Sequence, residues 1–183
     1  MKLGIDCVTS TLGHTAALKA LGVEFVLRYV STPGNAKNAT ADEVHALLAA
    51  GLDPKLVFET YETRALTGAR GGALDALAAR EQAAAVGLPD VILYFAVDYD
   101  APAADHPRIE AYIRAANGTI ENTVGVYGSY SVVEHCLDTG VCTEAVQTYG
   151  WSHGQLSTRA QIWQVLNGQT LAGLPVDLNI GRF

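Results

Sequence analysis

The stretch ILYFAVDYD, residues Ile92–Asp100, is an apolar run that ends in two carboxylates. A short continuous apolar run is typical of a strand that is buried on both faces. Because successive side chains of a strand point to opposite faces, we expect Asp98 and Asp100 to share one face and Tyr99 to lie on the other. Two such acids repel each other, and repulsion is one way in which a site keeps a proton donor beside an anion. The stretch therefore predicts a buried strand with a functional site at its carboxyl end.

The composition of the chain is that of a globular protein. Its 183 residues are 49% hydrophobic and 17% charged, which favours a single domain, residues 1–183, with a sizeable core. The net charge of −7 argues against nucleic acid as a partner, because binding phosphates requires a basic surface. No apolar run approaches the roughly 20 residues that span a bilayer. No basic segment followed by an apolar one opens the chain, so no signal peptide is visible and any export information lies elsewhere or has been removed.

The three cysteines, Cys7, Cys136 and Cys142, leave two interpretations open. Cys136 and Cys142 are close enough in sequence to pair across a short loop, which would suit an oxidising compartment. The interpretation we favour is three reduced, half-buried thiols. The chain has no Cys-x-x-Cys motif and no paired histidine spacing, so we expect neither a bound metal nor a cofactor.

Strand and helix patterns alternate along most of the chain. Glycines follow several of the helical patterns, at the position where a helix commonly ends, and Thr40–Glu43 and Ser131–Glu134 have capping-box spacing. This alternation is typical of βαβ units and a parallel sheet. The predicted strands are Leu3–Cys7, Phe25–Val30, Lys55–Tyr61, Ile92–Val97, Thr123–Tyr127, Ala145–Tyr149, Ala160–Gln164 and Val176–Leu178. The predicted helices are Thr15–Leu21, Ala41–Ala50, Gly71–Val86, Asp105–Asn117 and Ser131–Leu137.

Eight strands favour a closed barrel over an open sheet, so the predicted fold is an α/β, TIM-like barrel. The segments Gly150–Arg159 and Val165–Pro175 are rich in glycine, serine and other polar residues, and neither reads as a barrel helix. A complete eightfold barrel typically needs about 250 residues. We therefore predict a smaller barrel with eight strands, about five helices and a final third without helices.

Acids and aromatic side chains end most of the predicted strands. In parallel barrels the carboxyl ends of the strands form the functional rim. Carboxylates beside flat aromatic walls suit a sugar, because rings stack on sugar C–H faces and carboxylates hold hydroxyls and supply protons. The candidate residues at the rim are Asp6, Arg28, Tyr61, Glu62, Asp98, Asp100, Tyr127, Trp151, Trp163, Asp177 and Asn179.

The order of these motifs resembles that of a known family. The chain is similar to the glycoside-hydrolase-like domain family of bacterial and phage proteins, and more distantly to the family-25 glycoside hydrolases, which are muramidases of the Chalaropsis type. The resemblance spans essentially the whole chain. It is carried by Gly4-Ile5-Asp6, Phe25-Val26-Leu27-Arg28-Tyr29, Tyr94–Asp100, Ile162-Trp163-Gln164 and Val176-Asp177-Leu178-Asn179.

The resemblance implies a barrel of five helices and eight strands that cleaves the β-1,4 bond after N-acetylmuramic acid in peptidoglycan. It implies that Asp100 is the general acid, and that Asp98 orients or stabilises the acetamido group that assists attack at the anomeric carbon. Asp6 and Asp177 would complete an acidic floor, and Tyr61 would take its aromatic position. The expected partner is thus a cell-wall polysaccharide, bound by a monomer that is extracellular, cell-wall associated or phage-encoded.

One departure from the muramidase pattern affects the chemistry. Muramidases have glutamate where this chain has Asp100, which is shorter by one methylene, and a displacement of about 1 Å can cost on the order of 10²-fold in rate. The glycoside-hydrolase-like family commonly has this Asp-x-Asp form, which leaves open that it uses another acid. Glu62 is the first candidate for that acid and Glu59 a weaker one.

Three functions from different classes follow from these residues. The first is a glycosidase that acts on peptidoglycan or a similar polymer. The second is a catalytically weak or inactive barrel that binds wall glycan, which the missing glutamate suggests. The third is a divalent-metal hydrolase built on the acidic cluster, since hard cations prefer oxygen ligands; full activity in excess chelator would eliminate it.

Overall fold

A closed barrel of eight strands forms the centre of the computed structural model, which describes residues 1–183. The strands follow one another around the barrel in chain order, so the predicted barrel is confirmed. All eight predicted strands are present, and their ends differ by three residues or fewer from those expected, except that β7 continues to Leu171, seven residues past its predicted end. They are β1 (Lys2–Cys7), β2 (Val23–Val30), β3 (Asp53–Phe58), β4 (Leu93–Ala96), β5 (Val124–Gly128), β6 (Glu144–Gln147), β7 (Ile162–Leu171) and β8 (Leu174–Gly181).

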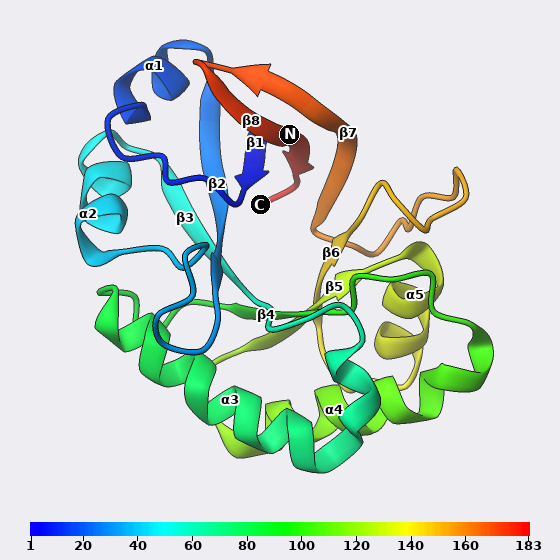
Figure 1. The fold of residues 1–183 in the computed structure, drawn as a ribbon. Coiled ribbons are helices and arrows are strands. Elements are labelled where there is room, and N and C mark those ends of the chain that lie inside the picture. Colours follow the sequence, from blue (N-terminus) through cyan, green and yellow to red (C-terminus); the bar gives the residue numbers. More distant parts are fainter.

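Five α-helices pack around the barrel except along β7 and β8, and their number is as expected. Figure 1 shows them as an arc from α1 to α5, whereas the β7–β8 side carries no helix. No helix is long and apolar enough to cross a membrane. The helices are α1 (Thr15–Ala20), α2 (Ala41–Ala49), α3 (Gly68–Ala85), α4 (His106–Thr119) and α5 (Tyr130–Asp138), and two short 3₁₀ turns occupy Arg64–Thr67 and Ala103–Asp105.

The direction of β8 differs from the expected parallel sheet. Strands β1 to β7 are parallel to their neighbours, but β8 pairs antiparallel with both β7 and β1. Only Ala172 and Gly173 separate β7 from β8, and both have positive φ angles, 51° and 81°. Two residues can close a hairpin but cannot make the long crossover that a parallel neighbour requires. The segment Val165–Pro175, expected as a connection, therefore belongs mostly to this hairpin.

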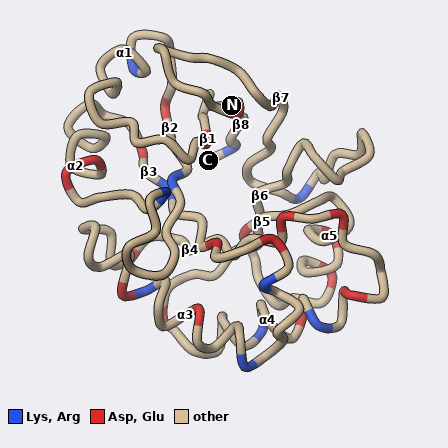
Figure 2. The backbone as a smooth tube through the Cα atoms, in the orientation of Figure 1, with Lys and Arg blue, Asp and Glu red and all other residues tan.

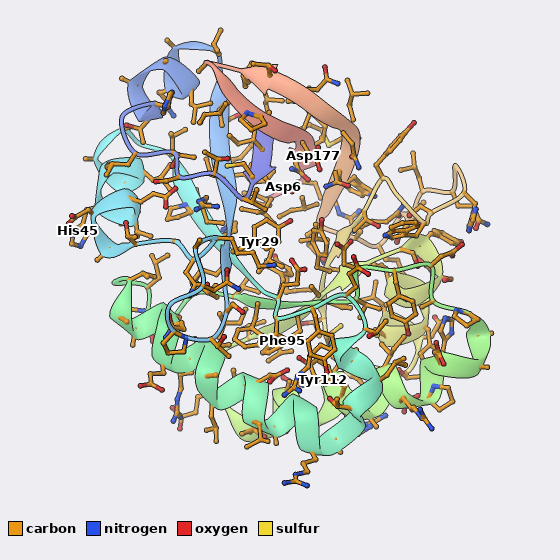
Figure 3. All side chains as sticks on the ribbon, in the orientation of Figure 1. Asp6, Tyr29, His45, Phe95, Tyr112 and Asp177 are labelled. Carbon is orange, nitrogen blue, oxygen red and sulfur yellow. The ribbon has the colours of Figure 1, made fainter.

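Alternate residues of the strands divide the core into an inner and an outer part. On β2, Phe25, Leu27 and Tyr29 face the barrel interior together with aromatic and aliphatic residues of β3 to β7. A side chain at Gly4 would overlap the Phe25 ring, so this glycine makes room for the ring inside the barrel. The outer part fills the space between the barrel and the helices, where Figure 3 shows Phe95 beside Tyr112.

The predictions for two helix caps and for the cysteines were correct in part. The Thr40 hydroxyl accepts the backbone N–H of Glu43 and caps α2, as predicted. The cap of α5 is Ser129, whose hydroxyl accepts the N–H of Val132, and not Ser131 as predicted. All three cysteines are free, and all three are buried rather than half-buried.

Candidate functional site

The carboxyl ends of β1 to β7 form a rim, called the barrel mouth below, and Asp6 lies at its base. Asp6 is 3% exposed. Its Oδ2 accepts hydrogen bonds from Asn179 Nδ2 at 2.7 Å and Gln164 Nε2 at 3.0 Å, and its Oδ1 accepts one from the Tyr29 hydroxyl at 3.2 Å. Figure 3 shows Asp6, Tyr29 and Asp177 together at the centre of the barrel. Every recorded partner of this carboxylate is a neutral donor.

Burial dominates the electrostatics of Asp6. It raises the pKa of this carboxyl to about 6, and the nearby charge of Asp177 acts in the same direction. The hydrogen bonds from Asn179, Gln164 and Tyr29 oppose this rise because they favour the anion. Asp6 is thus a carboxyl whose proton exchanges near pH 6 rather than near pH 4.

The side chain of Gln164 links the polar groups of the mouth. Its Nε2 donates to Asp6 and to Asp177 Oδ2 at 3.1 Å, and it lies 3.4 Å from the Tyr127 hydroxyl. Its Oε1 accepts the backbone N–H of Tyr149 at 3.0 Å. Asp177 Oδ1 in turn accepts the backbone N–H of Gly168 at 2.6 Å. One amide therefore fixes carboxylates from β1 and β8 in a single network.

Tyr127 lies among three acids. Its side chain is buried, and its pKa is raised well above the usual value, first by burial and then by the charges of Asp6, Asp98 and Asp177. The negative charges of β1, β8 and the segment after β4 therefore converge on one phenol. Nearby, Asn179 Oδ1 is buried and has no hydrogen-bond partner.

Asp98 lines a pocket of about 230 Å³ at the mouth. The indole Nε1 of Trp151 approaches Asp98 Oδ1 at 3.5 Å, and the Trp151 side chain is 45% exposed beside it. A carboxylate and an accessible aromatic ring thus share one small polar cavity. Its lining residues are Tyr29, Asp98, Tyr127, Thr148, Gly150, Trp151, Gln164, Asn167 and Asp177.

Asp100 lies further out than Asp98. Strand β4 ends at Ala96, so both acids belong to the loop that follows it. The Asp100 side chain is 57% exposed, and its Oδ1 lies 3.2 Å from His153 Nε2. Both acids therefore contact the loop between β6 and β7, Asp98 through Trp151 and Asp100 through His153.

The two glutamates considered as replacement acids have different surroundings. The backbone carbonyl of Glu62 accepts the N–H of Asp98 at 3.4 Å, which places the loop after β3 beside the loop after β4, but the Glu62 side chain is exposed. Glu59 forms an ion pair with Lys37 at 2.9 Å. Tyr61 is exposed, with the Arg64 guanidinium 5.8 Å from its ring centroid.

Arg28 and Trp163 are not brought to the mouth. Each alternates with residues that face the barrel interior, so each points outward. Arg28 was a candidate for the rim, but its partner is Glu43 of α2, with 2.6 Å between Nε and Oε1. Trp163 donates from Nε1 to the carbonyl of Ser157 at 2.9 Å. Both side chains hold the outer layer of the barrel.

Sequence reasoning missed Tyr29, Gln164 and His153 as site residues. Strand alternation could have found the first two, because Tyr29 follows the interior Leu27 by two positions and Gln164 follows the interior Ile162 in the same way. No local pattern marks His153, since its contact with Asp100 joins residues 53 positions apart.

Charged residues of both signs occur along the helices in Figure 2. No group of three or more His, Cys, Asp or Glu side chains has an arrangement that could hold a metal ion.

An eight-stranded α/β barrel with carboxylates at its mouth fits a glycoside hydrolase-like domain. The chain belongs to the Rv2525c-like, glycoside hydrolase-like domain family, whose model matches residues 16–178. A comparison with curated proteins finds no match.

Solved structures share this fold at low sequence identity. The Tat-secreted protein Rv2525c of Mycobacterium tuberculosis, in complex with L-tartrate, has a TM-score of 0.86 and 22% identity, over 100% of this chain and 96% of that one. GHIP, a glycosyl hydrolase 25 of Streptococcus pneumoniae, has a TM-score of 0.63 and 18% identity, over 99% of this chain and 87% of that one. The modular autolysin LytC of Streptococcus pneumoniae, in complex with a synthetic peptidoglycan ligand, has a TM-score of 0.63 and 14% identity, over 97% of this chain and 46% of that one. These similarities establish the fold.

Proposed function

We propose that this protein is a glycoside hydrolase that cleaves bacterial cell-wall glycan at the barrel mouth. The observation that carries the proposal is the pocket in which Asp98 faces Trp151, next to the buried Asp6 and the partly buried Asp177. An accessible indole offers a flat face to a sugar ring. Carboxylates around the same cavity favour the positive charge that develops on the sugar during glycosidic cleavage.

The acids divide between two tasks in this proposal. Asp98 lies in the pocket and stabilises the anomeric carbon, or the acetamido group that assists attack there. Asp100 stands on the outer side, where a proton must reach the leaving oxygen. Asp6 and Asp177 form the floor with Asn179, and their negative charge adds to that of Asp98 around Tyr127.

Cell-wall glycan is the substrate class that the structural similarities support. LytC was solved with a synthetic peptidoglycan ligand, and GHIP is a glycosyl hydrolase 25. We place the protein outside the cytoplasm or at the cell wall, in line with the Tat secretion of Rv2525c. All residues of the proposed site come from one chain, so the proposal needs no second subunit.

The test is the release of reducing ends from purified cell walls. Wild type should release them, whereas Asp98→Asn should lower the rate by about 10²-fold or more, the scale of a lost electrostatic stabiliser. Asp90→Asn is the matched control, because Asp90 is exposed at the opposite end of the barrel, ahead of β4. Circular dichroism checks that each variant folds. A wild-type protein that releases no reducing ends, or an Asp98→Asn variant as active as wild type, contradicts the proposal.

A second function is favoured by the position of Asp100. Its side chain is shorter than the glutamate of muramidases and more than half exposed, which suits a barrel that binds glycan without cleaving it. That function predicts that the protein sediments with cell walls and leaves their glycan intact. It also predicts that Asp100→Asn binds walls about as well as wild type.

A further inference from the structure

The loop between β6 and β7 meets the two acids after β4 side chain by side chain. Trp151 Nε1 lies 3.5 Å from Asp98, and two residues later His153 Nε2 lies 3.2 Å from Asp100. The contacting residues are two positions apart on each segment: 151 and 153 in the loop between β6 and β7, and 98 and 100 after β4. The proposed function uses three of these residues and leaves His153 without a role.

The two residues of this loop that contact the acids both have a strained backbone conformation. Trp151 has a φ of 63° and His153 a φ of 49°, and Ala172 in the β7–β8 turn is the other non-glycine residue with a positive φ. Residues other than glycine rarely adopt a positive φ. Such a backbone conformation persists where surrounding contacts fix it. Both strained positions in the loop direct a side chain at one of the two acids.

His153 also borders a second cavity. A pocket of about 410 Å³ lies between this loop and β7, and Thr148 and Gln164 line both this pocket and that of Asp98. His153 lines the second pocket, whereas Asp98 lines the first. Asp98 and His153 therefore border adjoining pockets that share part of their lining.

From this geometry we infer that His153 is the general acid of the reaction and that Asp100 is the positioning residue that holds its imidazole. The inference rests on the proposed function and names the group that delivers the proton. The imidazole lies against the Asp100 carboxylate, so a proton donor is present here in addition to the short aspartate. The His153 side chain is 70% exposed, which leaves it open to a substrate.

The proposed step balances in protons and electrons. In the imidazolium form of His153, Nε2–H donates to Asp100 and Nδ1–H faces the substrate. As the bond from the anomeric carbon to the glycosidic oxygen breaks, its electron pair stays on the oxygen, which takes the Nδ1 proton and leaves as an alcohol. Water then adds to the anomeric carbon, and the proton it loses returns the imidazole to its charged form. Asp98 stabilises the positive charge at that carbon throughout.

Leaving groups of different basicity distinguish a proton donor from a structural residue. A sugar alcohol must be protonated as it leaves, whereas 2,4-dinitrophenolate departs unprotonated. The two substrates are purified wall glycan and a 2,4-dinitrophenyl glycoside of the disaccharide that wild type releases from it. The variants are His153→Gln, Asp100→Asn and Asp98→Asn. His45→Gln is the control, because His45 is exposed and points away from the barrel on α2 in Figure 3.

We expect His153→Gln to lower kcat on wall glycan by about 10²- to 10⁴-fold, the usual contribution of a general acid. The same variant should lose less than about 10-fold on the dinitrophenyl glycoside. Asp100→Asn should show the same pattern with a smaller loss, and Asp98→Asn should lose activity on both substrates. The His45→Gln control should match wild type.

Two results overturn the inference while the proposed function stands. In one, wild type cleaves wall glycan and His153→Gln cleaves it equally fast. In the other, His153→Gln loses the same factor on both substrates. A wild-type protein that cleaves neither substrate overturns the proposed function and this inference together.

Discussion

Asp6 and Asp177 lie directly opposite each other in the antiparallel pair of β1 and β8. Two carboxylates in register would repel each other, and no arginine or lysine separates them. The side-chain amide of Gln164 donates to both and carries no charge of its own. No positive charge therefore offsets the burial of the Asp6 carboxylate, and its pKa is raised. The reversed direction of β8 creates this arrangement, because it brings the middle of β8 to the mouth.

The first prediction concerns the pH dependence of stability. The pKa of Asp6 is about 6 in the folded protein and 3.8 in the absence of structure. A raised carboxyl pKa gives stability that is fully present below pH 3.8 and lost as the pH rises through 6. Asp6→Asn removes this penalty at high pH. We expect the free energy of unfolding of the variant, relative to wild type, to rise by about 2.4 kcal/mol between pH 4 and pH 7.

Urea denaturation of both proteins at intervals of half a pH unit measures this difference. The asparagine remains compatible with the site, since its oxygen can accept from Asn179 and Gln164 while its amide donates to the Tyr29 hydroxyl. Titrating groups that do not interact with Asp6 are common to both proteins and cancel in the difference. Parallel pH profiles would show that burial does not shift the Asp6 titration.

The second prediction concerns Gln164. Gln164→Glu replaces the amide that donates to Asp6 and Asp177 with a third carboxylate at about the same distance. At pH 7 we expect a loss of about 3 kcal/mol in the free energy of unfolding, because a buried charge is left without a partner. The loss should shrink at pH 5, where carboxyls with raised pKa values take up protons.

The control for Gln164→Glu is Gln155→Glu, because Gln155 is exposed in the loop between β6 and β7. That variant should stay within about 0.5 kcal/mol of wild type, as surface substitutions usually do. Equal losses in both variants would show that added negative charge, and not the bridging amide, explains the effect.

The order of the strands and helices could be predicted because each element carries its own local signal. The apolar run before Asp98 and the capping threonine Thr40 are visible within a few residues of sequence. The direction of β8 could not be predicted in this way. The turn at Ala172-Gly173 is short, but the residues before it are polar enough to resemble a loop, because the helix-free side of the barrel exposes the outer face of β7.

Some residues of the candidate site could be predicted because they lie at the ends of strands, whereas others are brought together only by the fold. Asp6, Asp98 and Tyr127 come together at the mouth, as expected for residues at or near strand ends, whereas Asp177 and Asn179 reach it from within the antiparallel β8. A shift of one position along a strand reverses the face, and Arg28 and Trp163 were placed on the wrong one for this reason. The contact between Asp100 and His153 is invisible in the sequence, because it depends on how two loops meet.

The third prediction concerns the packing of α3 on α4. A methyl group at Gly72 would overlap the backbone carbonyl of Tyr112, which cannot move without shifting α4. We expect Gly72→Ala to lower the free energy of unfolding by about 2 kcal/mol or more, the range of overpacking in a core. Gly118 of α4 has open space around its Cα, so Gly118→Ala should raise stability by about 0.5–1 kcal/mol through helix propensity. Thermal denaturation compares the two, and a stabilised Gly72→Ala variant would contradict the close contact of the helices.

The fourth prediction separates the two tryptophans, which are the only ones in the chain. Trp151 is exposed beside Asp98, whereas Trp163 points outward, with the Arg182 guanidinium 5.4 Å from its ring centroid. In Trp163→Phe, the emission of Trp151 should change as soluble wall-glycan fragments are added, because a sugar ring that stacks on the indole displaces water from it. In Trp151→Phe, the emission of Trp163 should stay constant over the same titration. Trp151→Ala should weaken glycan binding by about 10-fold, close to 1.4 kcal/mol, with no loss of thermal stability. A response that follows Trp163 instead would move the glycan from the pocket of Asp98 to the outer face of β7.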